Sequence, residues 1–173
     1  MKSILTATLV LFLSLPALFV QAQDRPEFPE LAVKEDYAKS EALFQQITTW
    51  LTETDLDQQE ALRMESNAFI LKWITGSPTV TVGIDEHIVG LVDKNTQLLA
   101  IFMANYASFC ISNKENKSTL NPTRAGLLAM VKVYKKGIAI KKTRALDKLA
   151  TAVDKNELDD YIAKNLKSEG RAH

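Results

Sequence analysis

Residue types that build most catalytic and metal centres are scarce in this chain. Its 173 residues include one cysteine, Cys110, and two histidines, His87 and His173. A single cysteine excludes an intramolecular disulfide, so packing alone must stabilise the fold. Two histidines, one of them at the end of the chain, exclude a zinc site built from several histidines, and a mixed site would need Asp85 and Asp93 to converge on His87. We therefore predict no metal site and no cofactor.

The residues required for nucleophilic catalysis are scarce as well. Every Ser-His-Asp or Cys-His arrangement would need His87 as its base. Cys110 falls in the most apolar stretch of the chain after the N-terminus, where burial raises the pKa of a thiol and leaves it a poor nucleophile. The six glycines do not flank a serine in the pattern of a nucleophile elbow. The sequence therefore predicts no catalytic residue.

A long uncharged apolar run occurs at the N-terminus. Lys2, the apolar stretch of residues 4–15 and a small-residue site after it give residues 1–22 the composition of a cleavable signal peptide. Polar residues interrupt the run and no basic cluster follows it, which makes it a poor permanent anchor. We expect cleavage between Ala22 and Gln23, and a soluble mature protein that is periplasmic or secreted.

Strand patterns are nearly absent from the rest of the chain. Only residues 79–82 alternate with a period of two, and four residues without a second strand make no stable sheet. Apolar residues elsewhere recur at helical spacing. This periodicity predicts an all-α fold with helices over residues 37–51, 57–76, 85–94, 97–112, 122–136, 142–153 and 157–166.

The helical pattern and the prolines divide the mature chain. Pro26 and Pro29 disfavour helix and predict an extended leader over residues 23–36. Residues 37–167 form one domain, a bundle of five to seven short helices, and residues 168–173 are expected to fray. The domain is long enough to bury a substantial core.

Residues 97–112 are predicted to be the central helix of this bundle. They are apolar almost all round, as expected of a helix that neighbours cover on most sides. The polar side chains Gln97, Asn105, Ser108 and Ser112 fall within one narrow arc. This arc either lines a buried pocket or is the edge of the helix that faces solvent.

Local signals place the ends and faces of other helices. Asp57 and Glu60 have the spacing of a capping box, and Asp85 is a candidate cap for the short helix after it. Proline after asparagine at 121–122 predicts another helix start. The second helix is expected to turn one apolar face toward the core, formed by Ala61, Met64, Ala68 and Leu71 with Phe69 and Trp73 alongside.

The net charge is zero, but its distribution is uneven. Residues 24–65 hold 11 acidic and 4 basic side chains, whereas residues 114–148 hold 10 basic and 2 acidic ones. Seven basic residues form a dense group, which we call the basic cluster: Lys132, Lys135, Lys136, Lys141, Lys142, Arg144 and Lys148. The cluster either binds an anionic surface or solvates outer helix faces near the acidic helices, which offset its charge. Nucleic acid is not expected outside the cytoplasm, and Tyr134 is the one aromatic residue among the lysines.

Three segments resemble the matching parts of small exported helical proteins of bacteria that carry no assigned activity. They are residues 67–78 (NAFILKWITGSP), residues 121–137 (NPTRAGLLAMVKVYKKG) and the ending LDDYIAKNL. The resemblance implies a compartment and a helical fold. No functional residue follows from it.

The function expected from these features is non-enzymatic binding of a macromolecule or an anionic surface through the basic cluster. One alternative is a cell-wall or carbohydrate hydrolase, in which His87 or a pair of carboxylates would meet Asn105 or a hydroxyl in a cleft. Another is an inhibitor or immunity-type protein that blocks a toxin. The partner's identity does not follow from the sequence.

Overall fold

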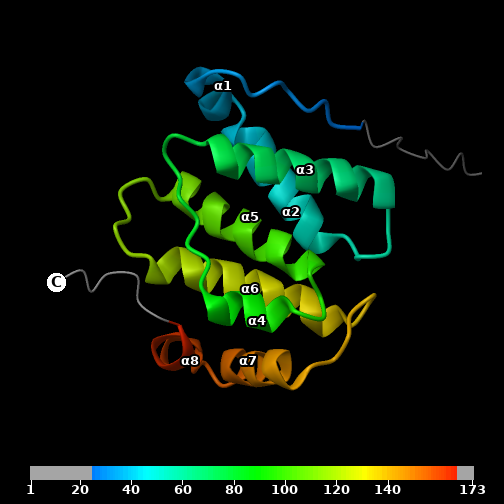
Figure 1. The fold of residues 1–173 in the computed structure, drawn as a ribbon, viewed down its shortest axis with the longest axis vertical. Coiled ribbons are helices and arrows are strands. Elements are labelled where there is room, and N and C mark those ends of the chain that lie inside the picture. Colours follow the sequence, from blue (N-terminus) through cyan, green and yellow to red (C-terminus); the bar gives the residue numbers. More distant parts are fainter. Residues whose placement is uncertain (1–24, 167–173) are drawn as a thin grey trace, which may run out of the picture.

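The computed structural model describes residues 25–166, and within this part of the chain helices joined by loops are the regular structure, without a strand (Figure 1). The predicted all-α bundle is confirmed. The predicted signal peptide, its cleavage site and the predicted frayed tail lie outside the described residues. The described helices are α1 (Lys34–Lys39), α2 (Glu41–Glu53), α3 (Glu60–Gly76), α4 (Glu86–Val92), α5 (Gln97–Ser112), α6 (Leu120–Lys136), α7 (Arg144–Asp154) and α8 (Leu158–Asn165).

Helix α5 is the centre of the bundle, as its apolar sequence predicts. Figure 1 shows it between α2 and α3 on one side and α6 on the other, and it contacts α4 as well. Leu98, Phe102 and Ala107 are fully buried. None of the described helices is both long and apolar enough to cross a membrane. Burial of α5 by its neighbours therefore accounts for its apolar surface.

Helix α6 packs along α5, and only glycine fits at position 126, where the two helices approach each other closely. A Cβ atom on Gly126 would come within 2.6 Å of the Phe102 ring and 2.8 Å of the Phe102 carbonyl oxygen. The missing side chain lets the two backbones approach. Helix α6 then ends at Gly137, whose φ of 71° is the left-handed conformation typical of a helix end.

The N-terminal part differs from the expected single helix over residues 37–51. Helix α1 begins at Lys34, inside the predicted extended leader, and α2 follows it after Ser40. The Asp36 carboxylate accepts hydrogen bonds from the backbone N–H groups of Ala32 and Val33, each at 3.0 Å. This interaction starts a helix early, so the described residues form eight helices rather than five to seven.

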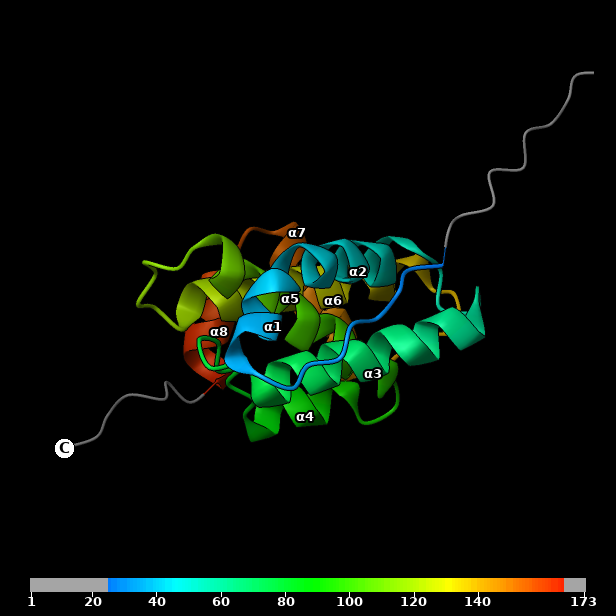
Figure 2. The same ribbon diagram turned by 90° about the horizontal axis from the view of Figure 1, so that it is seen from above.

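The residues before α1 run along α3, as seen from above in Figure 2. Phe28 packs its ring against Phe69 at 5.3 Å between centroids, and Arg25 pairs with Glu65. Leu31 is buried in the core. This extended stretch is therefore part of the packed domain.

The predicted core face of α3 is correct only in part. Phe69 and Trp73 are buried as predicted, together with Ile70, but Met64 is 68% exposed and Leu71 is 56% exposed. The Trp73 ring packs against the Phe44 ring of α2 with 4.4 Å between centroids and a tilt of 43°, and its Nε1 donates to the Tyr37 carbonyl oxygen at 3.0 Å. Packing of the large indole against α2 sets the rotation of the helix and leaves Met64 and Leu71 in solvent.

The predicted capping box at the start of α3 is also wrong. Asp57 lies ahead of the helix, and the residue at the cap position is Gln59, with a φ of 50°. The N-cap predicted before Pro122 is displaced too, because α6 begins at Leu120 after Thr119. By contrast, Asp85 caps α4 as predicted, with Oδ1 accepting from the Ile88 N–H at 2.9 Å.

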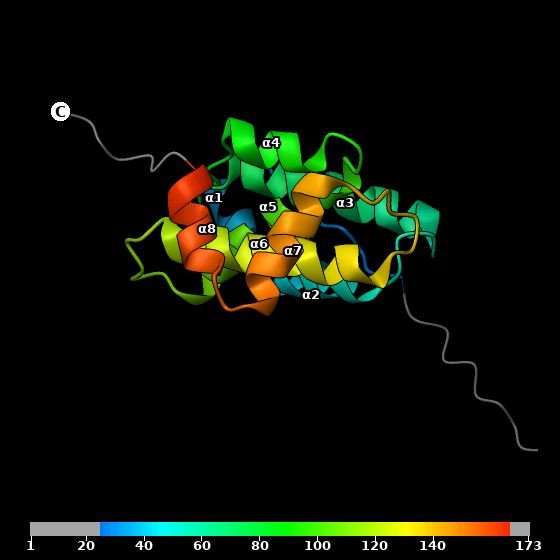
Figure 3. The same ribbon diagram turned by 90° about the horizontal axis from the view of Figure 1, so that it is seen from below.

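Helices α7 and α8 pack across α6 on the underside of the bundle (Figure 3). The link from α6 to α7 is held by Asn95, which is 1% exposed. Its Nδ2 donates to the Lys141 carbonyl oxygen at 2.9 Å, and its Oδ1 accepts from the Lys141 N–H at 2.8 Å. This pair of hydrogen bonds fixes the start of α7 against the turn before α5.

Candidate functional site

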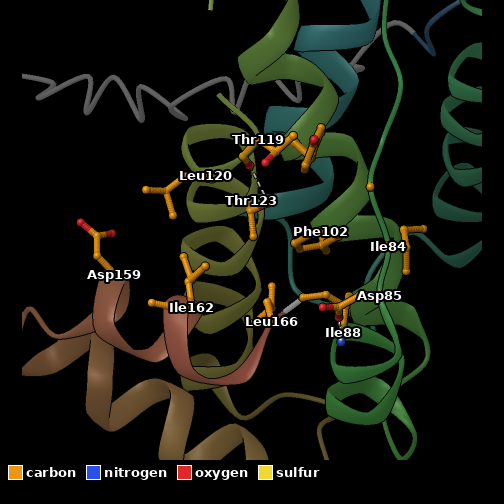
Figure 4. Close-up of a pocket in the computed structure, with 13 residues that line it drawn as sticks. Ile84, Asp85, Ile88, Phe102, Thr119, Leu120, Thr123, Asp159, Ile162 and Leu166 are labelled. Carbon is orange, nitrogen blue, oxygen red and sulfur yellow. Dashed lines mark hydrogen bonds between the residues drawn. The ribbon is translucent and has the colours of Figure 1, made fainter. Parts of the chain in front are cut away.

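A cavity of about 370 Å³ lies where α4, α5, α6 and α8 meet (Figure 4). We call it the apolar pocket. Phe102 of α5 and Ile88 of α4 are buried and line its inner part, and Ile162 and Leu166 line it from α8 and the residue after it. Ile84 and Leu120 also border it and are 36% and 41% exposed. The pocket therefore has an apolar interior and an apolar edge open to solvent.

Short-range interactions position these walls. The Asp85 carboxylate caps α4, which places Ile84 just before the helix and Ile88 in its first turn. Thr123 donates from Oγ1 to the Thr119 carbonyl oxygen at 2.7 Å and so closes the first turn of α6 beside the pocket. The shape of the site is thus set by the ends of helices.

Two carboxylates border the pocket, and both have structural partners. Asp85 accepts from the Ile88 N–H. Asp159 of α8 accepts from Nη1 of Arg124 on α6, at 2.6 and 2.7 Å to its two oxygens. The ion pair joins the two helices at the side of the pocket. Each carboxylate therefore already serves the fold.

His87 lies near this region but does not line the pocket. Its Nε2 is 2.8 Å from the Tyr161 hydroxyl, and the two rings meet edge to face at 5.6 Å. Burial raises the pKa of Tyr161. This contact joins α4 to α8, the helices from which Ile88 and Ile162 enter the pocket.

The groups required by the hydrolase alternative are not brought together. Asn105 donates to Thr52 Oγ1 of α2 at 3.0 Å and to the Ile101 carbonyl oxygen at 2.9 Å, whereas His87 contacts α8. The polar arc of α5 therefore does not line the apolar pocket. Within residues 25–166, no group of three or more His, Cys, Asp or Glu side chains is placed to hold a metal ion.

Cys110 is half-buried, and burial raises the pKa of its thiol. It packs against the hydrophobic core on α5. A protonated thiol in this setting behaves as a small apolar group. As the single cysteine of the chain, it forms no intramolecular disulfide.

The structure divides the basic cluster into two parts. Lys132 forms an ion pair with Glu53, and Lys135 forms one with Asp154. Lys136 lies 3.3 Å from Asp55 and donates to the Glu53 carbonyl oxygen. Carboxylates of the acidic N-terminal region thus lie beside two of these lysines and offset part of their charge.

The other part of the cluster surrounds the start of α7. Lys142, Arg144 and Lys148 border a shallow hollow together with Thr143, Asp147 and Thr151. We call this surface the basic hollow. Within the described residues, none of its three basic side chains forms an ion pair. The Lys142 ammonium lies 4.2 Å from the centre of the Tyr134 ring. Lys141 is exposed, with its backbone held by Asn95.

The apolar pocket has no counterpart in the sequence predictions. Its lining residues come from segments far apart in the chain, and most of them have the apolar character of ordinary core residues. Only the meeting of four helices turns these side chains into a site.

No protein-family model, curated protein or solved structure matches the chain. The resemblance of three segments to small exported bacterial proteins therefore remains a prediction. Functional inference depends on the chemistry of the residues described above.

Proposed function

We propose that the protein is an exported, non-enzymatic binding module whose ligand occupies the apolar pocket. The observation that carries this proposal is the cavity itself, which four helices border and mainly apolar side chains line, with one edge open to solvent. Its volume of about 370 Å³ lies within the range typical of small-molecule sites. Binding in such a site gains free energy by removing apolar ligand surface from water.

The polar groups at the pocket support binding rather than hydrolysis. Glycoside hydrolysis usually needs two carboxyl groups that flank the bond to be cleaved. Asp85 is engaged as a helix cap, and Asp159 is paired with Arg124. His87 contacts Tyr161 outside the pocket lining. These roles favour a site that holds a ligand without transforming it.

The proposal is tested by filling the pocket with a larger side chain. Ala163 lines it from α8 and is exposed, so Ala163→Trp should block the cavity without disturbing the core. The matched control is Ala145→Trp, an exposed alanine on α7 that does not line the pocket. Binding of the neutral fluorescent probe 1-aminoanthracene is measured by titration.

We expect the probe to bind the wild type and the control equally, and Ala163→Trp to weaken binding at least about tenfold, a loss of about 1.4 kcal/mol. Equal binding by both variants would place the probe elsewhere. Absence of binding to the wild type would remove the pocket as a ligand site. Either result contradicts the proposal.

A second candidate function is binding of an anionic partner through the basic hollow. Lys142, Arg144 and Lys148 supply three positive charges near the N-terminus of α7, whose backbone dipole adds to their attraction for anions. Lys132, Lys135 and Lys136 are less suited, because carboxylates lie beside them. The candidate surface is therefore smaller than the basic cluster predicted from the sequence.

This candidate is tested by retention on immobilised heparin, an anionic polysaccharide, at low and moderate salt. The variant reverses Lys142, Arg144 and Lys148 to Glu. The control reverses Lys34, Lys39 and Lys72, three exposed lysines on α1 and α3, and changes the net charge equally. Loss of retention only in the first variant supports the basic hollow. Equal retention by both variants would eliminate it.

A further inference from the structure

One face of helix α3 points into solvent although it has the pattern of a buried face. Ala61, Met64, Ala68 and Leu71 are exposed, and they follow one another at alternating spacings of three and four residues. We call these four residues the α3 stripe. That spacing is typical of the seam along which two helices pack in a coiled coil. Within residues 25–166, the stripe is therefore a helix-packing surface that no other helix covers.

The position of α3 leaves this face accessible to another molecule. The helix packs against α2 and α5 and lies at the outside of the bundle (Figure 1). Phe69, Ile70 and Trp73 form its buried side. The extended stretch before α1 contacts α3 at Phe69 and Glu65, beside the stripe. None of the four stripe residues lines the apolar pocket or the basic hollow, so the stripe is a separate surface.

Charged residues beside the stripe fit a second copy of the same helix. Glu65 and Lys72 lie two helical turns apart along one edge of it. When two α3 helices pack antiparallel about a two-fold axis beside Ala68, Glu65 of each copy lies opposite Lys72 of the other. In a parallel pair, Glu65 would instead face Glu60 of the other helix, and like charges repel. The charges therefore favour the antiparallel pair.

Both charged groups are available for this contact. Lys72 is exposed and forms no ion pair within the described residues. The Glu65 carboxylate pairs with Arg25, but the Glu65 side chain is 39% exposed and that of Arg25 is 61% exposed. Exposed ion pairs contribute little to stability, and a carboxylate accepts hydrogen bonds from more than one donor. A lysine of a second copy can therefore approach Glu65 while Arg25 stays in place.

We infer that the α3 stripe binds a second copy of this chain, with the two α3 helices antiparallel. Met64 of each copy would lie against Leu71 of the other, and the small side chain of Ala68 would let the helices come close at the axis. One helix from each copy forms this contact, which is smaller than the interface of a stable dimer. The dimer therefore forms only at high protein concentration. This inference does not depend on the apolar pocket.

Sedimentation equilibrium of the purified protein, from about 10 µM to about 1 mM, measures the association. The wild type should shift from monomer toward dimer over this range. Leu71→Gln removes an apolar side chain from both halves of the symmetric contact and should weaken the dimer at least about tenfold. The control is Val89→Gln, because Val89 on α4 is 53% exposed and lies outside the stripe. This control should associate as the wild type does.

Charge reversal tests the antiparallel arrangement. Lys72→Glu brings like charges together at both ends of the contact and should weaken the dimer at least about tenfold, and Glu65→Lys should do the same. An equimolar mixture of these two variants restores opposite charges at both ends, so mixed dimers should form at least about tenfold more tightly than either variant associates alone. Lys34→Glu, at an exposed position on α1, changes the net charge as Lys72→Glu does and should leave the association unchanged. Circular dichroism should show the same helix content in every variant.

Three results would overturn the inference. A wild type that stays monomeric up to about 1 mM would exclude the second copy and leave the stripe to a different protein. Dimers that form equally in Leu71→Gln and Val89→Gln would place the contact elsewhere on the molecule. Mixed charge variants that associate no better than either variant alone would exclude the antiparallel pair.

Discussion

The guanidinium of Arg63 shows how much one side chain contributes at the residue scale. Arg63 is 8% exposed and donates to three carbonyl oxygens at and after the end of α2: Leu51 at 3.2 Å, Thr54 at 3.0 Å and Asp55 at 2.8 Å. Burial lowers its pKa, and the carboxylates of Asp55 and Asp57 act in the opposite direction. A positive charge here also complements the negative end of the helix dipole.

Replacement of Arg63 by Ala should therefore be strongly destabilising. It leaves several partly buried carbonyl oxygens without donors, and we expect a loss of about 2–4 kcal/mol in the free energy of unfolding. Urea denaturation measures the change. Arg144→Ala, at an exposed position on α7, is the control and should stay within about 0.5 kcal/mol of the wild type. A loss below about 1 kcal/mol in Arg63→Ala would show that water replaces these hydrogen bonds.

The two aspartates predicted as helix caps, Asp85 and Asp57, show how far the start of a helix can be predicted from one residue type. Asp85 has the extended backbone conformation of a cap and accepts from Ile88 N–H as expected. Asp57 has the same chemistry, but the turn after α2 continues past it to Gln59. A capping side chain acts only where the backbone already leaves the helix, and at α3 the tertiary packing decides that point.

At the scale of elements, the close approach of α5 and α6 depends on Gly126. A methyl group there would come within 2.6 Å of the Phe102 ring and 2.8 Å of a backbone oxygen, so the helices would have to separate. Gly90 on α4 has no atom within 4 Å of the same ideal Cβ position. The two helical glycines thus form a natural pair for comparison.

We expect Gly126→Ala to destabilise the protein by about 1–3 kcal/mol because the core becomes overpacked. Gly90→Ala should instead stabilise it by about 0.5–1 kcal/mol, since alanine favours the helix. Thermal and urea unfolding of both variants measure the two effects. Equal changes in the two variants would mean that the α5–α6 contact adjusts to a methyl group without cost.

The orientation of α3 was the least predictable property of an element. Its sequence carries large apolar residues on both sides, with Ile70 and Trp73 on one and Met64 and Leu71 on the other. Periodicity alone cannot choose between two apolar sides. The contact with α2 decides between them, because the Phe44 ring of α2 packs against the Trp73 ring.

For the whole molecule, burial of three weak acids predicts a loss of stability at alkaline pH. Burial is the largest cause of raised pKa values for Cys110, whose ordinary value is 9.0, and for Tyr134 and Tyr161, whose ordinary value is 10.0. Above these ordinary values the unfolded chain releases protons that the folded protein still holds. The free energy of unfolding therefore falls as pH rises.

The expected profile is flat from neutral pH to about pH 8.5 and declines through the ordinary thiol and phenol range, at about pH 9–11. Urea unfolding at successive pH values measures it. Tyr161→Phe removes one of the three groups and should make the decline shallower, even though it also loses the contact with His87. A stability that rises over this range, or an unchanged slope in the variant, would contradict the prediction.

For the whole molecule, the sequence shows how many charged residues each region holds, but not which of them lie close together in the fold. The sequence separates an acidic N-terminal region from the basic cluster, and the fold brings Glu53 and Asp55 of the first beside Lys132 and Lys136 of the second. Basic residues therefore divide into a partly neutralised group and the basic hollow. Which lysines belong to which group depends on contacts between residues about 80 positions apart.

Signals that act within one or two helical turns were sufficient for the helical class, the central position of α5 (Gln97–Ser112), the cap at Asp85 and the end of α6 at Gly137. Only the tertiary structure decided the buried face of α3, the division of the basic cluster and the existence of the apolar pocket. The physical reason is the distance along the chain over which each interaction acts. Helix propensity, caps and periodicity depend on neighbours along the chain, whereas a cavity and an ion pair between helices depend on side chains that meet only after the helices have packed.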